Sequence, residues 1–138
     1  MDRRLEEYPK QTTDKVRYAD TDRQGHVNNI QFAAFLETGR VELLYNPDAP
    51  LAGDSAEFVI ARLEIDFLGE IQWPGSVNIG TGVKRIGSSS IGIEQAIFQE
   101  DRCVARAEAV VVHIDSATRK SRPLSGATRA VLQNILLP

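Results

Sequence analysis

The segment from about Asn28 to Tyr45 places the strongest constraint on how this chain can fold. It reads as a helix, and its apolar and small residues occur around most of the circumference instead of along one stripe. A helix that is apolar over so wide an arc is normally buried. The rest of the chain must therefore supply a surface that covers it. The residues concerned are Ile30, Phe32, Ala33, Ala34, Phe35, Leu36, Gly39, Val41, Leu43 and Leu44.

Most of the remaining chain alternates between apolar and polar residues, which indicates strands. One short strand is expected at 11–18, before the helix, and four are expected after it, at 58–67, 77–86, 91–99 and 103–115. Because the four later strands follow one another through short connections, they favour an antiparallel meander. The sequence therefore predicts an α+β domain in which an antiparallel sheet wraps around one central helix. The tail at 127–138 could add a short terminal helix.

The alternation also predicts which side chains face the core. In each of two strands, every second residue is apolar or small, so these residues share one face of the sheet. They are Val59, Ala61, Leu63, Ile65 and Phe67 in the first strand after the helix, and Val77, Ile79, Thr81 and Val83 in the next.

Length and composition set further limits. The 138 residues suit one domain, 1–138, and the formal net charge of −3 gives no basic field to attract nucleic acid or an anionic membrane. No apolar run reaches the ~20 residues of a membrane span, and the first ten residues contain no secretory signal, so a cytoplasmic location is expected. One cysteine and two histidines make a structural zinc site improbable. Cys103 is expected to be a structural thiol and His113 a structural histidine.

The loop before the helix carries polar residues that could serve chemistry or only a turn. It contains Asp20, Asp22, Gly25 and His26, and the pair Asn28 and Asn29 follows. Aspartate and asparagine are favoured in turns and at helix N-caps, so the loop alone favours a structural role. The same carboxylates at the mouth of a buried helix could act on a substrate.

Three stretches together resemble a known family. They are "YADTDRQGHVNNIQFAAFLETGRVELL", "VKRIGSSSIGIEQAIFQ" and "AVVVHIDSATRKSRPL", which extend roughly from Val16 to Leu124. In this order and spacing they resemble the hotdog-fold acyl-CoA thioesterases of the 4-hydroxybenzoyl-CoA thioesterase type. The "GHVNN" part is also similar to the loop of the plant acyl-carrier-protein thioesterases, which share the fold.

The resemblance implies a hotdog fold, with a five-stranded antiparallel sheet around one long helix. It implies a thioester hydrolase without a cofactor or metal. It also implies a homodimer or homotetramer in which two sheets pair edge to edge and the active sites lie at the dimer interface. The expected substrate is an acyl- or aroyl-CoA; the acyl group, and the choice between CoA and an acyl-carrier protein, stay open.

The resemblance also suggests roles for the loop residues. The catalytic carboxylate of the family corresponds to Asp22, which could act as general base or as nucleophile. Gly25 would let the chain turn sharply and let substrate approach, and the backbone N–H of Asn29 would stabilise the oxyanion. Asn28 is expected to cap the helix more than to touch substrate. His26 is catalytic in the plant-type loop, whereas this position is commonly apolar in the benzoyl-CoA type, so its role stays open.

Residues farther along the chain complete the predicted site. Glu37 could lie at the acyl pocket or could pair with Arg40 one turn away. Basic and hydroxyl side chains suit the phosphates and pantetheine of CoA, although a solvated turn would use the same residues. By resemblance, the last of the three serines points toward an active site. The residues in question are Lys84, Arg85, Ser88, Ser89 and Ser90.

Two other functions share the predicted fold. A non-catalytic protein that senses acyl-CoA would bind the ligand without turnover. A dehydratase or hydratase is disfavoured, because no such motif is present in the sequence.

Overall fold

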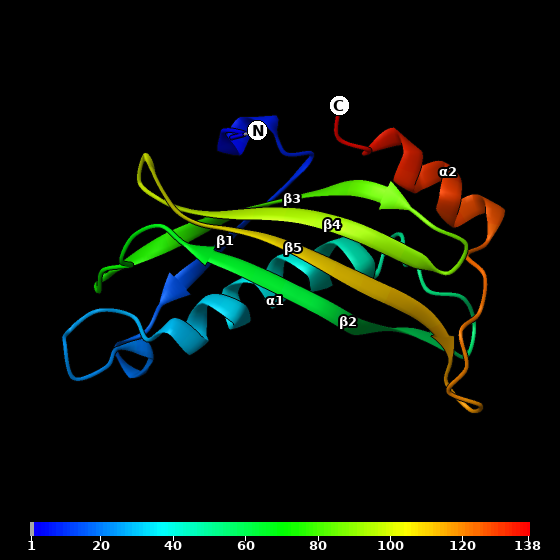
Figure 1. The fold of residues 1–138 in the computed structure, drawn as a ribbon, viewed down its shortest axis with the longest axis horizontal. Coiled ribbons are helices and arrows are strands. Elements are labelled where there is room, and N and C mark those ends of the chain that lie inside the picture. The colour runs from blue at the N-terminus through cyan, green and yellow to red at the C-terminus, as the bar shows by residue number, and fades with distance from the viewer. Residues whose placement is uncertain (1) are drawn as a thin grey trace.

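Five strands form one antiparallel sheet in the order β1-β3-β4-β5-β2 in the computed structural model, which describes residues 2–138 (Figure 1). The strands are β1 Lys10–Val16, β2 Ala56–Phe67, β3 Gly75–Ile86, β4 Ser90–Gln99 and β5 Arg102–Asp115. The helices are α1 Asn29–Leu44 and α2 Gly126–Asn134, and the 3-10 turns are η1 Leu5–Glu7 and η2 Tyr18–Asp20. This is the predicted α+β architecture of five antiparallel strands and a helix.

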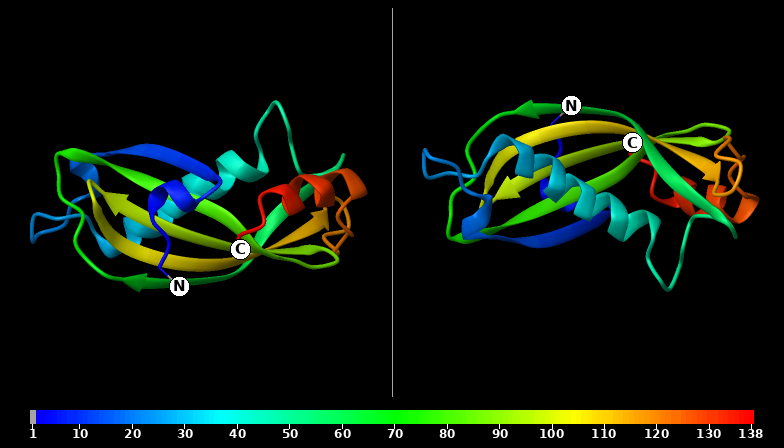
Figure 2. Two further views of the ribbon diagram at one scale, coloured as in Figure 1. Left: turned by 90° about the horizontal axis from the view of Figure 1, so that it is seen from above. Right: turned by 90° about the horizontal axis from the view of Figure 1, so that it is seen from below.

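Helix α1 lies across one face of the curved sheet, as the two views in Figure 2 show. Phe32, Phe35 and Leu36 of α1 are buried against Val77 and Ile79 of β3. The helix packs on β1, β3 and β4, so the predicted burial is confirmed for the side that faces the sheet. It is wrong for the rest of the circumference, because Ile30 and Val41 are 74% and 45% exposed. Its ends are also close to the prediction, because α1 begins one residue after Asn28 and stops one residue before Tyr45.

Glycine at position 39 sets how closely α1 approaches the sheet. A Cβ atom at Gly39 would lie 2.8 Å from both Ile79 Cγ2 and Thr81 Oγ1, and 2.9 Å from Gln95 Nε2. Gln95 is itself buried and ties the two layers together, since its Nε2 donates to Leu36 O at 2.9 Å and to Thr81 Oγ1 at 3.0 Å. At this point no side chain of the helix separates its backbone from the sheet, so the two layers approach closely.

The order of the strands differs from the predicted meander. Strands β3, β4 and β5 are consecutive hairpin neighbours, as expected, but β2 pairs with β5 at the far edge of the sheet. The chain from Leu68 to Pro74 must therefore cross the end of the sheet from β2 to β3. Seven residues can span the ~15 Å of three strand spacings. A connection longer than the usual two to five residues of a hairpin was the available sign of this crossover.

A β-bulge explains why the predicted inward face of β2 is only half right. The pairing of β2 with β5 shifts between Ile60 and Arg62. Leu63 and Ile65 pack against the core as predicted, but before the shift Phe58 is the buried residue, not Val59. An extra residue in one strand reverses the alternation, and period-2 reasoning cannot locate it. In β3, by contrast, all four predicted residues are buried.

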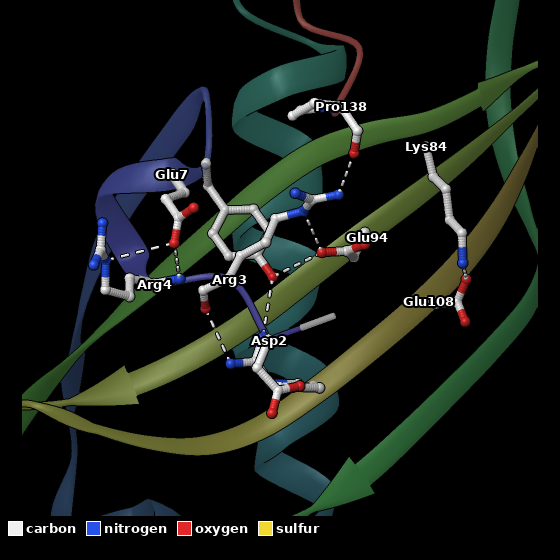
Figure 3. Close-up of polar contacts among 10 residues, drawn as sticks. Asp2, Arg3, Arg4, Glu7, Lys84, Glu94, Glu108 and Pro138 are labelled. Carbon is white, nitrogen blue, oxygen red and sulfur yellow. Dashed lines mark hydrogen bonds and ion pairs between the residues drawn. The ribbon is translucent and has the colours of Figure 1, made fainter.

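The outer face of the sheet carries the two ends of the chain. Glycines 80 and 82 leave room there for Tyr8 and Leu137. Arg3 joins the ends, because its Nε donates to Glu94 at 3.0 Å and its Nη2 donates to Pro138 O at 2.9 Å (Figure 3). Burial, together with the charge of Glu94, raises the pKa of the Tyr8 hydroxyl. This face is therefore occupied by a polar network and is not the face that α1 covers.

We expect Gly39→Ala to destabilise the protein, although alanine is favoured over glycine inside a helix by about 1 kcal/mol. The added methyl would overpack a contact already at van der Waals distance, at a cost of about 1–3 kcal/mol. Urea unfolding followed by circular dichroism measures the change. Gly126→Ala in α2 is the matched control, because nothing lies within 4 Å of its added Cβ. A midpoint for Gly39→Ala equal to or above that of the control would contradict the close approach.

Candidate active site

The turn before α1 is built on a buried carboxylate. Asp20 is 2% exposed, and its two oxygens accept the backbone N–H of Arg17 at 2.9 Å and the Arg17 guanidinium at 2.8 Å. Its own carbonyl accepts the N–H of Asn28 at 2.9 Å. Asp20 therefore joins β1 to the start of α1, in agreement with the structural role expected for it.

Asp22 lies in a tight loop that closes on itself. Its N–H donates to His26 O at 3.0 Å, and its carbonyl accepts the N–H of Gly25 at 3.1 Å. The side-chain Oδ1 accepts the N–H of Gln24 at 2.9 Å, which uses one of the two carboxylate oxygens. Gly25 has φ +86, a conformation that glycine adopts without strain, so the predicted sharp turn is confirmed.

The first turn of α1 leaves one amide available. Asn28 caps the helix as predicted, since its Oδ1 accepts Ile30 N–H at 3.1 Å and its carbonyl accepts Gln31 N–H at 2.9 Å. For the N–H of Asn29, residues 2–138 provide no acceptor. This N–H stands at the positive end of the helix dipole, where a developing negative charge is stabilised.

His26 contacts a segment that the sequence did not connect with the loop. It forms an antiparallel bridge with Gln72, and its Nε2 lies 3.5 Å from Oε1 of Glu70. Both residues belong to the β2–β3 connection, which crosses the sheet end beside the loop. Glu70 was not predicted as a site residue, because its proximity depends on the crossover that the meander prediction missed.

The predicted CoA-binding residues lie at the other end of β3. Figure 3 shows Lys84 on the face of the sheet opposite α1, in an ion pair with Glu108. The pairing of β3 with β4 shifts between Val83 and Arg85, and this bulge leaves both Lys84 and Arg85 exposed. Arg85 has no carboxylate partner within residues 2–138, so it is the freer of the two charges.

The three serines form the β3–β4 turn next to β5. Ser89 O accepts the N–H of His113 at 2.7 Å, and Ser88 O accepts the N–H of Leu124 at 2.9 Å. Their backbone is therefore fixed by the core, while the side chains of Ser88, Ser89 and Ser90 are exposed or half-buried. The turn is well ordered by its neighbours and keeps hydroxyls at the surface.

One copy of the chain does not bring the two halves of the predicted site together. Val16, at the loop end of β1, pairs with Gly75 at the start of β3, whereas Ser90 follows the end of β3. The 12 residues of β3 span roughly 36 Å at the usual rise per residue. Asp22 and Ser90 therefore lie at opposite ends of the sheet.

Glu37 and Arg40 do not form the ion pair that is one of the two alternatives for Glu37. Glu37 is exposed, whereas Arg40 is 7% exposed and donates to Gln95 Oε1 at 3.2 Å. Burial lowers the pKa of Arg40, and the charge of Glu37 partly offsets this effect. The two side chains separate because the helix turns position 40 toward the sheet and position 37 toward solvent.

The two residues predicted to be structural are held by the core. His113 is buried; its Nε2 accepts Gly53 N–H at 3.1 Å and its Nδ1 lies 2.9 Å from Arg122 O. Burial raises the pKa of the Cys103 thiol, which disfavours the reactive thiolate.

Within residues 2–138, no three His, Cys, Asp or Glu side chains are grouped so that they could hold a metal ion. None of the helices in this part of the chain is long and apolar enough to cross a membrane.

Comparison with known proteins identifies the family of this arrangement. Residues 16–132 match the model of the thioesterase-like superfamily. The chain therefore belongs to the thioesterase-like superfamily and is a thioester hydrolase. A curated relative, the acyl-CoA thioester hydrolase YbgC of Escherichia coli, is 25% identical over 114 residues, which are 80% of this chain and 85% of that protein.

Solved structures agree with this assignment. A predicted thioesterase from Bacillus stearothermophilus superposes with a TM-score of 0.82 at 30% identity, covering 91% of this chain and 95% of that one. A thioesterase from Thermus thermophilus, solved with coenzyme A and zinc, gives a TM-score of 0.80 at 27% identity over 91% and 98% of the two chains. The sheet and helix described above are therefore those of the hotdog thioesterases.

Proposed function

We propose that this protein hydrolyses acyl-CoA thioesters and that Asp22 is its catalytic carboxylate. The observation that carries the proposal is the junction between the loop and α1. There, one oxygen of Asp22 is left over from the turn, and the N–H of Asn29 has no acceptor among residues 2–138. A base or nucleophile and an oxyanion donor are the two groups that thioester hydrolysis needs first. The curated relative hydrolyses acyl-CoA thioesters, and the Thermus thioesterase binds coenzyme A, which supports CoA as the carrier.

Two routes use the same residues. As a general base, Asp22 takes a proton from water while the water oxygen bonds to the thioester carbon. As a nucleophile, its carboxylate oxygen bonds to that carbon, and water then hydrolyses the mixed anhydride. In both routes, negative charge develops on the carbonyl oxygen and is stabilised by the N–H of Asn29. The C–S bond then breaks, and CoA leaves as a thiolate that is protonated to the thiol.

A second copy of the chain would complete the site. Strand β2 is an edge strand, and Ile60 and Phe67 on it are 50% and 51% exposed. An uncovered edge with apolar side chains is prone to pair with another strand. In a two-fold antiparallel pairing of β2 with its copy, the end of the sheet that holds Asp22 would meet the partner's β3–β4 turn. The two halves of the site lie ~36 Å apart along β3 within one chain, and this pairing would bring one half of each chain to the other half of its partner.

Arg85 is the candidate for the phosphates of CoA. It is exposed and free of a carboxylate partner in the described part of the chain, whereas Lys84 is engaged by Glu108. A guanidinium offers paired donors that suit a phosphate group. The serine hydroxyls of the neighbouring turn could contact the pantetheine arm, and exposed Glu37 stays a candidate for the acyl pocket.

We expect Asp22→Asn to lower thioester hydrolysis by at least about 10²-fold, because the amide can act neither as base nor as nucleophile. Asparagine keeps the oxygen that accepts the N–H of Gln24, so the unfolding midpoint should stay near that of the wild type. Release of free thiol across short, long, branched and aromatic acyl-CoAs gives the rate. Asp48→Asn, in an exposed loop, is the control. Full activity in Asp22→Asn would refute the assignment, and ligand binding without turnover in the wild type would favour an acyl-CoA sensor.

Asn29→Pro isolates the proposed oxyanion donor. Proline has no N–H but is tolerated at the first position of a helix, and the preceding residue, Asn28, already has the extended conformation that proline requires (φ −63, ψ 141). We expect kcat to fall by about 10²–10³-fold with the stability nearly unchanged. Asn29→Ala removes the side chain but keeps the N–H and should stay near wild-type activity. Equal activity of the two variants would exclude this N–H as the donor.

Substitution of Arg85 tests the carrier. Because its guanidinium is exposed, Arg85→Gln should raise KM for acyl-CoA by about fivefold and leave kcat unchanged, whereas Lys84→Gln should have little effect. The same acyl group on pantetheine lacks the nucleotide, so its KM should not respond to Arg85→Gln. An equal rise of KM for both substrates would point to a role other than phosphate binding.

A further inference from the structure

The β2–β3 connection, residues 68–74, lies directly against the loop that carries Asp22. The N–H of Val27 donates to Ile71 O at 3.0 Å, and His26 bridges Gln72 as an antiparallel pair. On the same side, the rings of Tyr18 and Trp73 meet edge to face with centroids 5.1 Å apart. The two segments therefore contact each other along several consecutive residues.

The other side of the connection is fixed to the sheet. Gln99 is buried and holds Gln72 twice, since Gln72 N–H donates to its Oε1 at 2.8 Å and its Nε2 donates to Gln72 O at 2.9 Å. The guanidinium of Arg102 lies 3.4 Å from Glu70 O, and Ile71 is fully buried. The backbone around Glu70 is thus held from both sides and cannot drift relative to the loop.

This support places the Glu70 carboxylate next to the imidazole. Its Oε1 lies 3.5 Å from His26 Nε2, and its Oε2 accepts the Gln72 Nε2–H at 3.3 Å. The His26 side chain is 24% exposed, so one edge of the ring faces Glu70 while part of it stays open to solvent. Asp22 lies on the same loop as His26, and its N–H donates to the carbonyl of His26 at 3.0 Å.

We propose that Glu70 is a positioning residue that fixes the tautomer and orientation of His26. A neutral imidazole carries one N–H, and the hydrogen bond made at one nitrogen decides which nitrogen is protonated. The negative charge of Glu70, 3.5 Å from Nε2, favours the proton on that nitrogen and leaves Nδ1 as an acceptor. Because His26 is hydrogen-bonded to Asp22 through the backbone, an acceptor nitrogen on its ring can hold and orient the attacking water. The inference rests on the proposed hydrolysis by Asp22 and gives His26 the role that the sequence leaves open.

The two histidines of the chain provide a direct test. His113 receives Gly53 N–H at Nε2 and faces Arg122 O with Nδ1, so it should be the Nδ1–H tautomer, the opposite of that proposed for His26. ¹⁵N NMR of ring-labelled protein above pH 8 distinguishes the two tautomers, and His26→Gln assigns the signals. His113 then serves as the internal reference in every variant.

We expect His26 to be the Nε2–H tautomer in the wild type and a mixture of both tautomers in Glu70→Ala, while His113 does not change. The kcat for acyl-CoA hydrolysis should fall about tenfold in Glu70→Ala, with KM within about twofold. Glu70→Gln keeps an acceptor oxygen and should restore most of the tautomer preference and of kcat. Glu6→Ala removes a similarly exposed, ion-paired carboxylate far from the loop and should match the wild type.

Different results separate the inference from the function on which it rests. An unchanged His26 tautomer in Glu70→Ala, or a wild-type His26 in the Nδ1–H form, overturns the positioning role. An active wild type with full kcat in Glu70→Ala does the same and leaves the proposed function intact. A tautomer change in a protein that hydrolyses no acyl-CoA supports the pairing and contradicts the proposed function alone.

Discussion

The contact between α1 and the sheet at Gly39 is the interaction on which the rest of the structure depends. Because no side chain separates the layers there, Gln95 can reach from β4 to a carbonyl of the helix and to Thr81 of β3. This contact sets the height and the position of the helix on the sheet. The helix start therefore lies at the end of the sheet where the loop of Asp22 closes. It carries the cap at Asn28 and the N–H of Asn29, which has no acceptor among residues 2–138.

Much of this arrangement follows from local patterns in the sequence. The asparagine cap, the glycine turn and the inward face of β3 are set by neighbouring residues, and the structure agrees with each of them. Of the apolar circumference of α1, only the side against the sheet is buried. The position of β2 is not local. It depends on which edge of the sheet remains open after β3, β4 and β5 have paired. The alternation of apolar and polar residues in β2 does not indicate which edge that is. The bulge between Ile60 and Arg62 is hidden for the same reason.

The candidate site also contains both local features, which the sequence predicts, and non-local ones, which it does not. Residues that act through the turn itself could be inferred from spacing, as the cap at Asn28 and the buried Asp20 show. Glu70 is 44 positions from His26 in the sequence and meets it only because of the crossover. Spacing also allowed a pair between Glu37 and Arg40, one of two alternatives, which does not form because the sheet offers Arg40 a buried partner in Gln95. Tertiary packing therefore decides which charges are free to act.

The bulge in β3 has a consequence for the evolution and design of this domain. A single additional residue turns Lys84 and Arg85 together toward the outer face and returns Ile86 to the inside. Without this shift in the pairing, regular alternation would point the guanidinium of Arg85 inward and the side chain of Ile86 outward. Deletion of one residue here would keep Ile86 inside and leave one cation on the outer face, so the length of this strand sets how many positive charges that face carries.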